Sequence, residues 1–308
     1  MDIAVIGSNM VDLITYIDRM PKEGETLEAP SFEMGCGGKG ANQAVAAAKL
    51  GSKVMMVTKT GDDLFSDMTI QNLKSYGIDT EFTVKEPGTS SGVAPIFVDP
   101  ESQNRILIIK GANNCLKPED IDRAARKIKQ SSLIVLQLEV PLETVYYAID
   151  FGKKLGIPIL LNPAPANSDL DFDYVTKCDF FIPNETELEM LTGTKAETEE
   201  DIETAANYLL ENGVKNVIVT LGSRGVLWMT EGRKERIPAY KVNAIDSTGA
   251  GDAFIGCFSH YYVKEKDPIK AIHMANAYAA LSVTKRGTQK SYASWEEFAS
   301  FLAENKTE

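Results

Sequence analysis

The chain has 308 residues, enough to bury a full core in one large α/β domain or in two ordinary ones. A hydrophobic content of 44% and a charged content of 25% are typical of a soluble globular enzyme. The net charge of −12 argues against a nucleic-acid-binding protein, because such proteins present a basic surface to the phosphate backbone.

Short apolar runs alternate along the chain with longer amphipathic segments, and this alternation predicts a parallel sheet wrapped by helices. The predicted buried strands are residues 3–7, 53–58, 133–137, 158–161, 179–182 and 216–220. The predicted helices are residues 42–50, 63–76, 118–129, 142–155, 200–212, 251–264 and 268–284, and a further helix begins at residue 184. No linker, repeat or low-complexity tract interrupts the pattern, so we expect one domain over residues 1–308.

Two stretches, residues 13–34 and 92–109, break this alternation. The first holds short strand-like pieces around residues 21–25, and the second is typical of a hairpin with its turn near residues 99–104. A small sheet cannot bury both of its faces by itself. We therefore expect the two stretches to form a small separate sheet that covers a cleft, meets a partner chain, or does both.

Cysteine and histidine are sparse. The four cysteines form no CxxC pair, which favours packed thiols in a reducing compartment. With only two histidines, we expect neither a histidine-rich zinc site nor a histidine-based nucleophilic triad. We recognise no signal peptide before the first predicted strand and no apolar run of membrane-spanning length. These features predict a cytoplasmic protein without a membrane partner.

The segment 246–252 reads Asp-Ser-Thr-Gly-Ala-Gly-Asp. Its glycines, Gly249 and Gly251, permit a turn that points several N–H groups into one concavity suited to an anion. A helix beginning at about Gly251 adds its free first-turn N–H groups to the same place. Asp252 would then face the acceptor, which suits a phosphoryl group and a hydroxyl that needs deprotonation. A glycine-rich turn whose aspartate complements the helix dipole explains these residues equally well.

A second glycine-rich stretch, residues 35–40, opens an alanine-rich helix. It places Lys39 and Asn42 near the start of that helix, where both side chains can meet a ligand. An anion-binding nest and a simple glycine loop are equally good interpretations. A P-loop is excluded, because no Gly-Lys-Ser/Thr follows at the required spacing.

Two further segments follow predicted strands. Asn184 and Glu187 have the spacing of a helix N-cap and its capping partner, which is the simpler explanation. The alternative places them over a Mg²⁺ that keeps several of its waters beside nucleotide phosphates. Residues 220–225 predict either a hairpin turn or a ligand-binding strand end. All four segments follow a strand or start a helix, so they can converge on one edge of the sheet.

Together these motifs make the chain similar to the ribokinase-type sugar kinases over nearly its full length. The resemblance is carried by residues 37–44, Gly-Gly-Lys-Gly-Ala-Asn-Gln-Ala, and by residues 246–252. Residues 162–165 (Asn-Pro-Ala-Pro), 183–187 and 221–225 agree with it. It implies an ATP-dependent phosphotransferase with a central, mostly parallel sheet flanked by helices and a small β-sheet lid. It also implies a homodimer joined through the apolar lid residues Val93, Ile96, Val98, Ile106 and Ile108.

The resemblance implies roles for individual residues. Asp252 would be the base, and the N–H groups of Gly249, Ala250 and Gly251 would hold the transferred phosphate. The positions that match pentose contacts are Met10, Asp12, Gly38, Lys39, Asn42, Glu139 and Asp252. Those on the nucleotide side are Asn184, Thr220, Gly222, Ser223, Gly225, Gly251 and Asn276. Glu187 would organise Mg²⁺ through water. A monovalent cation, usually K⁺, would be held mostly by backbone carbonyls of Asp246, Thr248, Ser282, Lys285, Gly287 and Ser291.

One departure from the family pattern bears on the sugar. Met10 stands where ribose-specific members usually carry asparagine, and residues 1–12 resemble the deoxyribokinase branch. Ribose would bury its 2-hydroxyl there with poor compensation, at a cost of ~1–3 kcal/mol. We therefore predict 5-phosphorylation of 2-deoxy-D-ribose, with D-ribose kinase as the alternative and packing as the other explanation of Met10. A nucleoside kinase and a non-catalytic sugar-binding regulator are further alternatives, and the intact Asp252 speaks against the regulator.

Overall fold

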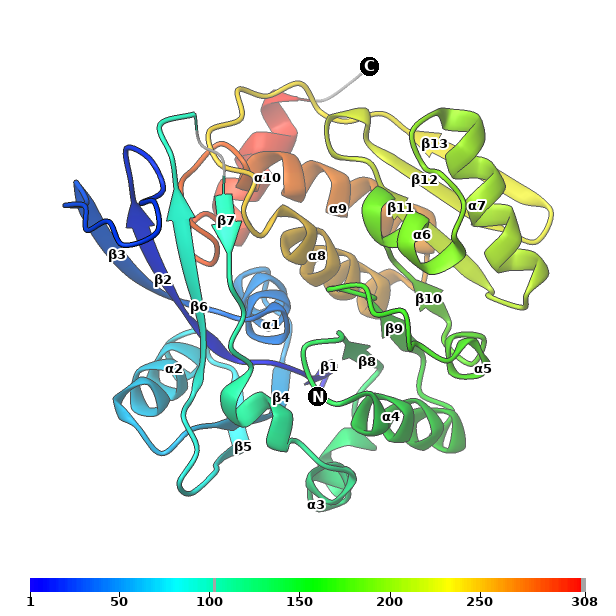
Figure 1. The fold of residues 1–308 in the computed structure, drawn as a ribbon. Helices are drawn as coiled ribbons and strands as arrows, with labels where there is room; N and C mark the ends of the chain where they lie inside the picture. Colours follow the sequence, from blue (N-terminus) through cyan, green and yellow to red (C-terminus); the bar gives the residue numbers. More distant parts are fainter. Residues whose placement is uncertain (102–103, 306–308) are drawn as a thin grey trace.

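The computed structural model describes residues 1–101 and 104–305. Within these residues, a nine-stranded sheet forms the centre of the molecule (Figure 1). Its strands are β1 (Ile3–Ile6), β4 (Val54–Thr60), β5 (Asp79–Lys85), β8 (Leu133–Leu136), β9 (Ile159–Leu161), β10 (Phe180–Phe181), β11 (Asn216–Thr220), β12 (Val226–Thr230) and β13 (Arg233–Ile237). The order is β13-β12-β11-β10-β9-β8-β1-β4-β5. All neighbours from β11 to β5 pair in parallel, whereas β12 and β13 pair antiparallel.

Helices cover both faces of this sheet. They are α1 (Lys39–Lys49), α2 (Leu64–Ser75), α3 (Pro118–Ile128), α4 (Leu142–Leu155), α5 (Phe172–Val175), α6 (Glu185–Thr192), α7 (Glu199–Glu211), α8 (Ala250–Glu265), α9 (Pro268–Ser282) and α10 (Trp295–Glu304). Successive side chains of β1 point to opposite faces. Ile3 and Val5 therefore join the core beneath α1, α8 and α9, while Ala4 and Ile6 join the core beneath α3, α4 and α7.

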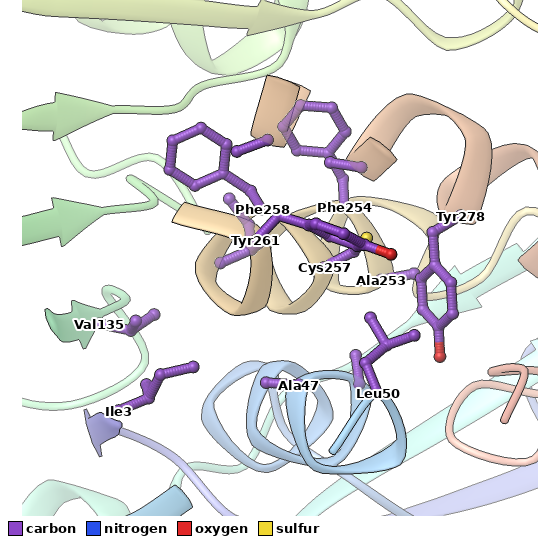
Figure 2. Packing of buried hydrophobic residues seen from close by; sticks show 14 of the residues in the cluster. Ile3, Ala47, Leu50, Val135, Ala253, Phe254, Cys257, Phe258, Tyr261 and Tyr278 are labelled. Atoms are coloured by element: carbon purple, nitrogen blue, oxygen red, sulfur yellow. The ribbon is translucent and has the colours of Figure 1, made fainter. Parts of the chain in front are cut away.

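Helices α1 and α8 pack closely against each other. Figure 2 shows Ala47 of α1 and Leu50, just after this helix, facing side chains of α8 such as Ala253 and Cys257. The close approach requires Gly256, because a Cβ there would lie 2.4 Å from the Cβ of Ala46. This contact brings the N-terminal halves of the two helices together.

The predicted strands and helices of the central sheet are confirmed. The elements β5, β13, α5 and α10 are absent from the prediction, and β12 was implied only by the hairpin interpretation of residues 220–225. The sequences of β5 and β13 are dominated by polar residues, as is common for the edges of a sheet, and so lack an apolar run. Helix α10 has a sequence signal that was missed, since Ser294 and Glu297 form a capping box before an amphipathic segment.

The predicted small sheet is also confirmed. It contains β2 (Met10–Tyr16), β3 (Ser31–Gly37), β6 (Gly92–Val98) and β7 (Asn104–Ile106), in the order β3-β2-β6-β7. It lies at the left of Figure 1, beside the central sheet. Its strands extend beyond the predicted stretch 13–34, to Met10 and Gly37. The predicted turn at residues 99–104 includes residues 102–103, which lie outside the described residues.

Candidate active site

Asp252 lies in the first turn of α8, where its side chain is buried and only 6% exposed. Gly249 precedes the helix with a φ of 75°, so the predicted glycine turn into a helix is confirmed. The Asp252 carboxylate accepts two hydrogen bonds from α1. Asn42 Nδ2 donates to Oδ2 at 2.9 Å, and Gln43 Nε2 donates to Oδ1 at 2.9 Å. The packing of α1 on α8 therefore holds this carboxylate from both sides.

The turn before Asp252 can accept an anion. Among the described residues, the Gly249 N–H has no hydrogen-bond partner, while the Ala250 N–H reaches the Ser247 carbonyl at 3.2 Å. Gly251 has an ordinary negative φ, and a Cβ there would meet no described atom within 4 Å. No contact among the described residues therefore explains this glycine. The open space beside it suits a ligand that approaches the backbone closely.

Two cavities meet at Asp252. One, of about 170 Å³, is lined by Asn184, Glu187, Thr220 and the turn at residues 249–251. The other, of about 250 Å³, lies beneath the small sheet. Both are lined by Lys39, Ser247, Gly249 and Asp252. The arrangement provides space for two ligands on either side of one carboxylate.

The larger of these cavities brings together the residues predicted to bind the pentose. Its lining includes Met10, Asp12, Gly38, Lys39, Asn42, Glu139 and Asp252. Ala94, Ile96 and Ile106 of the small sheet and Ile108, just after β7, form its apolar wall. Carboxylates and amides opposite an apolar wall are the groups expected for a sugar, which has hydroxyls on a carbon ring.

Charge is concentrated around Lys39. Its neighbours are the carboxylates of Asp252, Glu139 and Glu187. Burial alone would lower the pKa of Lys39, but these carboxylates raise it above its usual value. Burial raises the pKa of Glu139, although the Lys39 charge opposes the shift. Glu139 accepts hydrogen bonds from Ser8 Oγ at 2.5 Å and from the Lys39 N–H at 2.8 Å, so it anchors the start of α1.

Asp12 projects from β2 into the same cavity. Burial, followed by the charges of Glu139 and Asp252, raises the pKa of Asp12 to about 7. In the described part of the chain, no residue donates a hydrogen bond to its carboxylate. Its oxygens are therefore available to a ligand.

The nucleotide-side residues are only partly brought together. Asn184, Thr220 and Gly251 line the smaller cavity, whereas Gly222, Ser223, Gly225 and Asn276 are not in its described lining. Packing alone requires a glycine at position 225, because a Cβ there would lie 2.1 Å from the Ile237 carbonyl oxygen. The Asn276 amide donates to the Pro238 carbonyl at 2.7 Å.

Residues 221–225 form the turn between β11 and β12, which confirms the hairpin interpretation of residues 220–225.

The capping interpretation of Asn184 and Glu187 is confirmed. The Asn184 side chain accepts from the Glu187 N–H at 2.8 Å, and Glu187 Oε2 accepts from the Asn184 N–H at 2.9 Å. Burial raises the pKa of Glu187, against the opposing influence of that N–H and of the Lys39 charge. Because Glu187 also lines the smaller cavity, its second oxygen can serve a ligand while the first caps α6.

The loop around Asp246 is organised by its carboxylate. Oδ1 accepts from the Thr248 N–H and Oδ2 from the Gly287 N–H, each at 2.9 Å. This ties together two segments predicted to hold a monovalent cation. The Lys285 side chain pairs with Glu297 at 2.7 Å, so any part it plays there is through its backbone.

The remaining predicted cation positions, Ser282 and Ser291, use their hydroxyls on nearby carbonyls of their own segments. Across residues 1–101 and 104–305, no group of three or more His, Cys, Asp or Glu is arranged to hold a metal.

Several buried polar residues were missed as site residues. Gln43 and Asn162 stand within motifs that carried the family resemblance, yet neither received a role. Ser8 supports Glu139 from the end of β1. Gln137 Nε2 donates to Gln43 Oε1 at 2.7 Å. Only the amide-rich motif at residues 41–43 could have indicated such contacts.

Residues 1–295 match the pfkB family of carbohydrate kinases. This chain belongs to that family. The kinase is an ATP-dependent phosphotransferase whose acceptor is a sugar hydroxyl. None of its described helices is both long and apolar enough to cross a membrane.

Relatives of this kinase cover its whole length. Over 306 residues it is 64% identical to the deoxyribokinase of Salmonella typhi, covering 99% of this chain and 100% of the relative. It is 40% identical to the ribokinase of Mus musculus, covering 94% and 91% of the two chains. Its fold is similar to that of Arabidopsis thaliana ribokinase complexed with ribose and ATP, with a TM-score of 0.92 at 30% identity and 98% coverage of each chain.

Proposed function

We propose that this kinase transfers the γ-phosphoryl group of ATP to the 5-hydroxyl of 2-deoxy-D-ribose, giving 2-deoxy-D-ribose 5-phosphate. The observation that carries the proposal is the meeting of two cavities at Asp252, one lined by the predicted pentose residues and one by the glycine turn. The 64% identity with a deoxyribokinase, against 40% with a ribokinase, supports the deoxy sugar.

In this proposal Asp252 accepts the proton of the 5-hydroxyl as the sugar oxygen bonds to the γ-phosphorus. The bond from that phosphorus to the β–γ bridging oxygen breaks, and ADP leaves. The N–H groups of Gly249, Ala250 and Gly251 stabilise the transferring group. Lys39, kept charged by its acidic neighbours, adds a positive charge beside it. Phosphoryl transfer depends mainly on such positioning and electrostatic stabilisation.

The residues present also fit the two cations. Glu187 lines the smaller cavity with one carboxylate oxygen not used in its capping bond, which suits a water-coordinated Mg²⁺ that neutralises phosphate charge. The Asp246 carboxylate ties residues 246–248 to residues 285–287, and backbone carbonyls of such a loop are donors suited to K⁺. We propose both as companions of ATP.

Met10 supports the choice of sugar. It lies in the cavity wall, is 2% exposed, and faces Gly92 across the β2–β6 pair. A thioether offers at most a weak hydrogen bond, so a buried 2-hydroxyl would lack a good partner there. A 2-deoxy sugar presents only a methylene group at that place. D-ribose kinase is the remaining candidate within the family.

The test is a coupled assay of ATP turnover with 2-deoxy-D-ribose, D-ribose and their nucleosides. We expect kcat/KM for 2-deoxy-D-ribose to exceed that for D-ribose by about fivefold or more, since an unpaired buried hydroxyl costs ~1–3 kcal/mol. Preference for D-ribose would contradict the choice of sugar. Preference for a nucleoside would contradict the free pentose. Sugar binding without turnover would support a non-catalytic regulator.

We further propose that residues 1–308 act as one kinase unit, with the small sheet as a lid over the sugar. Phe32, Met34 and Leu107 are exposed on this sheet or just beyond it, at 59%, 44% and 61%. Such an apolar surface favours pairing with a second copy. The four cysteines of the kinase are free thiols, which supports a cytoplasmic location.

Sedimentation at micromolar concentration tests the pairing, and a monomeric wild type would contradict it. We expect Phe32→Glu to dissociate the dimer. Leu64→Glu is the control, because Leu64 is also exposed but begins α2, outside the small sheet.

A further inference from the structure

Gln43 stands out because it touches the proposed base without facing either ligand. Its Nε2 donates to Asp252 Oδ1 at 2.9 Å. In the described lining of the two cavities at Asp252, however, Gln43 does not appear. It is 1% exposed, inside the contact between α1 and α8. Its side chain therefore acts on the site only through another residue.

The orientation of this amide is determined by a chain of hydrogen bonds that starts at the backbone. The Ile182 carbonyl can only accept, and Asn162 Nδ2 donates to it at 2.9 Å. Asn162 Oδ1 must then face Gln43, whose Nε2 donates to it at 3.1 Å. Gln43 Oε1 is left to accept from Gln137 Nε2 at 2.7 Å. A reversed Gln43 amide would place its oxygen against the Asp252 carboxylate.

Two partners of Gln43 follow neighbouring strands of the central sheet. Gln137 follows β8 and Asn162 follows β9, and both are buried. The Gln43 backbone is also confined, because its carbonyl oxygen would lie 2.7 Å from a Cβ placed on Gly256 of α8. The amide therefore has little freedom to swing away from Asp252.

We propose that Gln43 is a positioning residue that sets the orientation of the Asp252 carboxylate, with Asn162 and Gln137 setting the orientation of Gln43. The proposal rests on the proposed role of Asp252 as the base. A carboxylate held at both oxygens presents its remaining lone pairs in one direction, toward the sugar hydroxyl. Asn42 holds the other oxygen but also lines the sugar cavity. Of the two residues, only Gln43 can therefore be substituted to change the orientation of Asp252 without removing a contact in that cavity.

The first test is Gln43→Met, which keeps a similar side-chain length and removes both hydrogen-bonding groups. We expect kcat with ATP and 2-deoxy-D-ribose to fall roughly 10- to 100-fold, because small misplacements of a catalytic group have effects of that size. The dissociation constant of the sugar, measured by calorimetry, should change less than about threefold, since the cavity contacts remain.

A second variant keeps the proposal testable if Gln43→Met does not fold. Gln137→Met removes only the donor to Gln43 Oε1, and Gln137 Oε1 itself has no partner among the described residues. We expect a smaller loss of kcat, about 3- to 10-fold, as for one lost hydrogen bond, with the sugar affinity unchanged.

The control for loss of an amide is Asn216→Leu. Like Gln43, the Asn216 amide both donates and accepts: it donates to the Asp179 carbonyl and accepts from Trp228 Nε1. Asn216 begins β11, away from the cavities at Asp252. Its kcat should stay within about twofold of wild type, as for sites that share no partner.

A kcat near wild type in both glutamine variants would overturn the proposal, as would a parallel loss of kcat and sugar affinity. If Asp252→Asn retained full activity, the proposed base itself would fail. If Asp252→Asn were inactive while Gln43→Met behaved as wild type, only the positioning role would fail.

Discussion

Two buried aspartates face the same cavity and are held in opposite ways. Asp252, at the start of α8, accepts a hydrogen bond at each oxygen from an amide of α1. Asp12, on β2 of the small sheet, receives none from the described residues, and burial with the nearby charges raises its pKa to about 7. Gly37 of β3 leaves the room that the Asp12 carboxylate occupies, since a Cβ there would be 2.2 Å from Oδ1.

The different hydrogen bonding of the two carboxylates fits two different roles, catalysis for Asp252 and sugar recognition for Asp12. A base must be oriented before the substrate arrives, so the protein supplies its partners. A recognition group is completed by the ligand, so its oxygens stay without protein partners at a cost in the empty site. We infer that Asp252 serves transfer and Asp12 serves sugar binding, and the following predictions test that division.

Asp252→Asn should have the largest effect. Loss of the base is expected to lower kcat by roughly 10²- to 10⁴-fold, while sugar affinity stays within about threefold. Steady-state kinetics and calorimetric sugar binding measure the two quantities. Substantial residual turnover would contradict the role of Asp252 as the base.

Asp12→Asn should give the opposite signature. Hydrogen bonds to a charged group contribute about 1.5–3 kcal/mol, so sugar affinity should weaken by roughly 10- to 100-fold. The fall in kcat at saturating sugar should be smaller than the fall in affinity. If Asp12→Asn reduced kcat as strongly as Asp252→Asn, the division between the two aspartates would be wrong.

Met10→Asn should move the sugar preference without changing the base. An amide at this wall can bond a 2-hydroxyl, so the ratio of kcat/KM for 2-deoxy-D-ribose to that for D-ribose should fall by about 5- to 100-fold. Competition between the two sugars in one assay measures the ratio directly. An unchanged ratio would mean that Met10 only packs.

The smallest effect is expected in the stability of the sugar-free enzyme. The pKa of Asp12 is raised from 3.8 to about 7 on folding, so between these values the folded state binds more protons than the unfolded state. The free energy of unfolding contributed by this group therefore falls as pH rises through that window.

The Asp12→Asn variant has no titrating group at this position, so its free energy of unfolding does not fall with pH in this way. The Tm of the variant minus that of the wild type should therefore be larger at pH 8 than at pH 6. Each kcal/mol of unfolding free energy corresponds to roughly 2–4 °C in Tm. Thermal unfolding without sugar measures this difference in Tm. Saturating 2-deoxy-D-ribose should raise the Tm of the wild type more than that of the variant. A pH-independent difference in Tm would contradict the raised pKa.

Most of the fold was predictable because its signals are local. The apolar runs of β1, β4 and β8 and the helical periodicity between them predict a parallel sheet without any long-range information. The same holds for Asp252, whose glycine turn and helix start lie within a few residues of it. The edge strands β5 and β13 lacked such a signal, since one or both of their faces are polar.

The sequence by itself determined the class of fold, the glycine turn and the candidate base. Only the tertiary structure decided what holds that base, because Gln43 and Asp252 are 209 positions apart and meet through the close packing of α1 on α8. It also decided that the Asp12 carboxylate receives no hydrogen bond from any described residue. Turn chemistry and periodicity are properties of neighbouring residues, whereas a hydrogen bond between distant elements depends on how those elements pack.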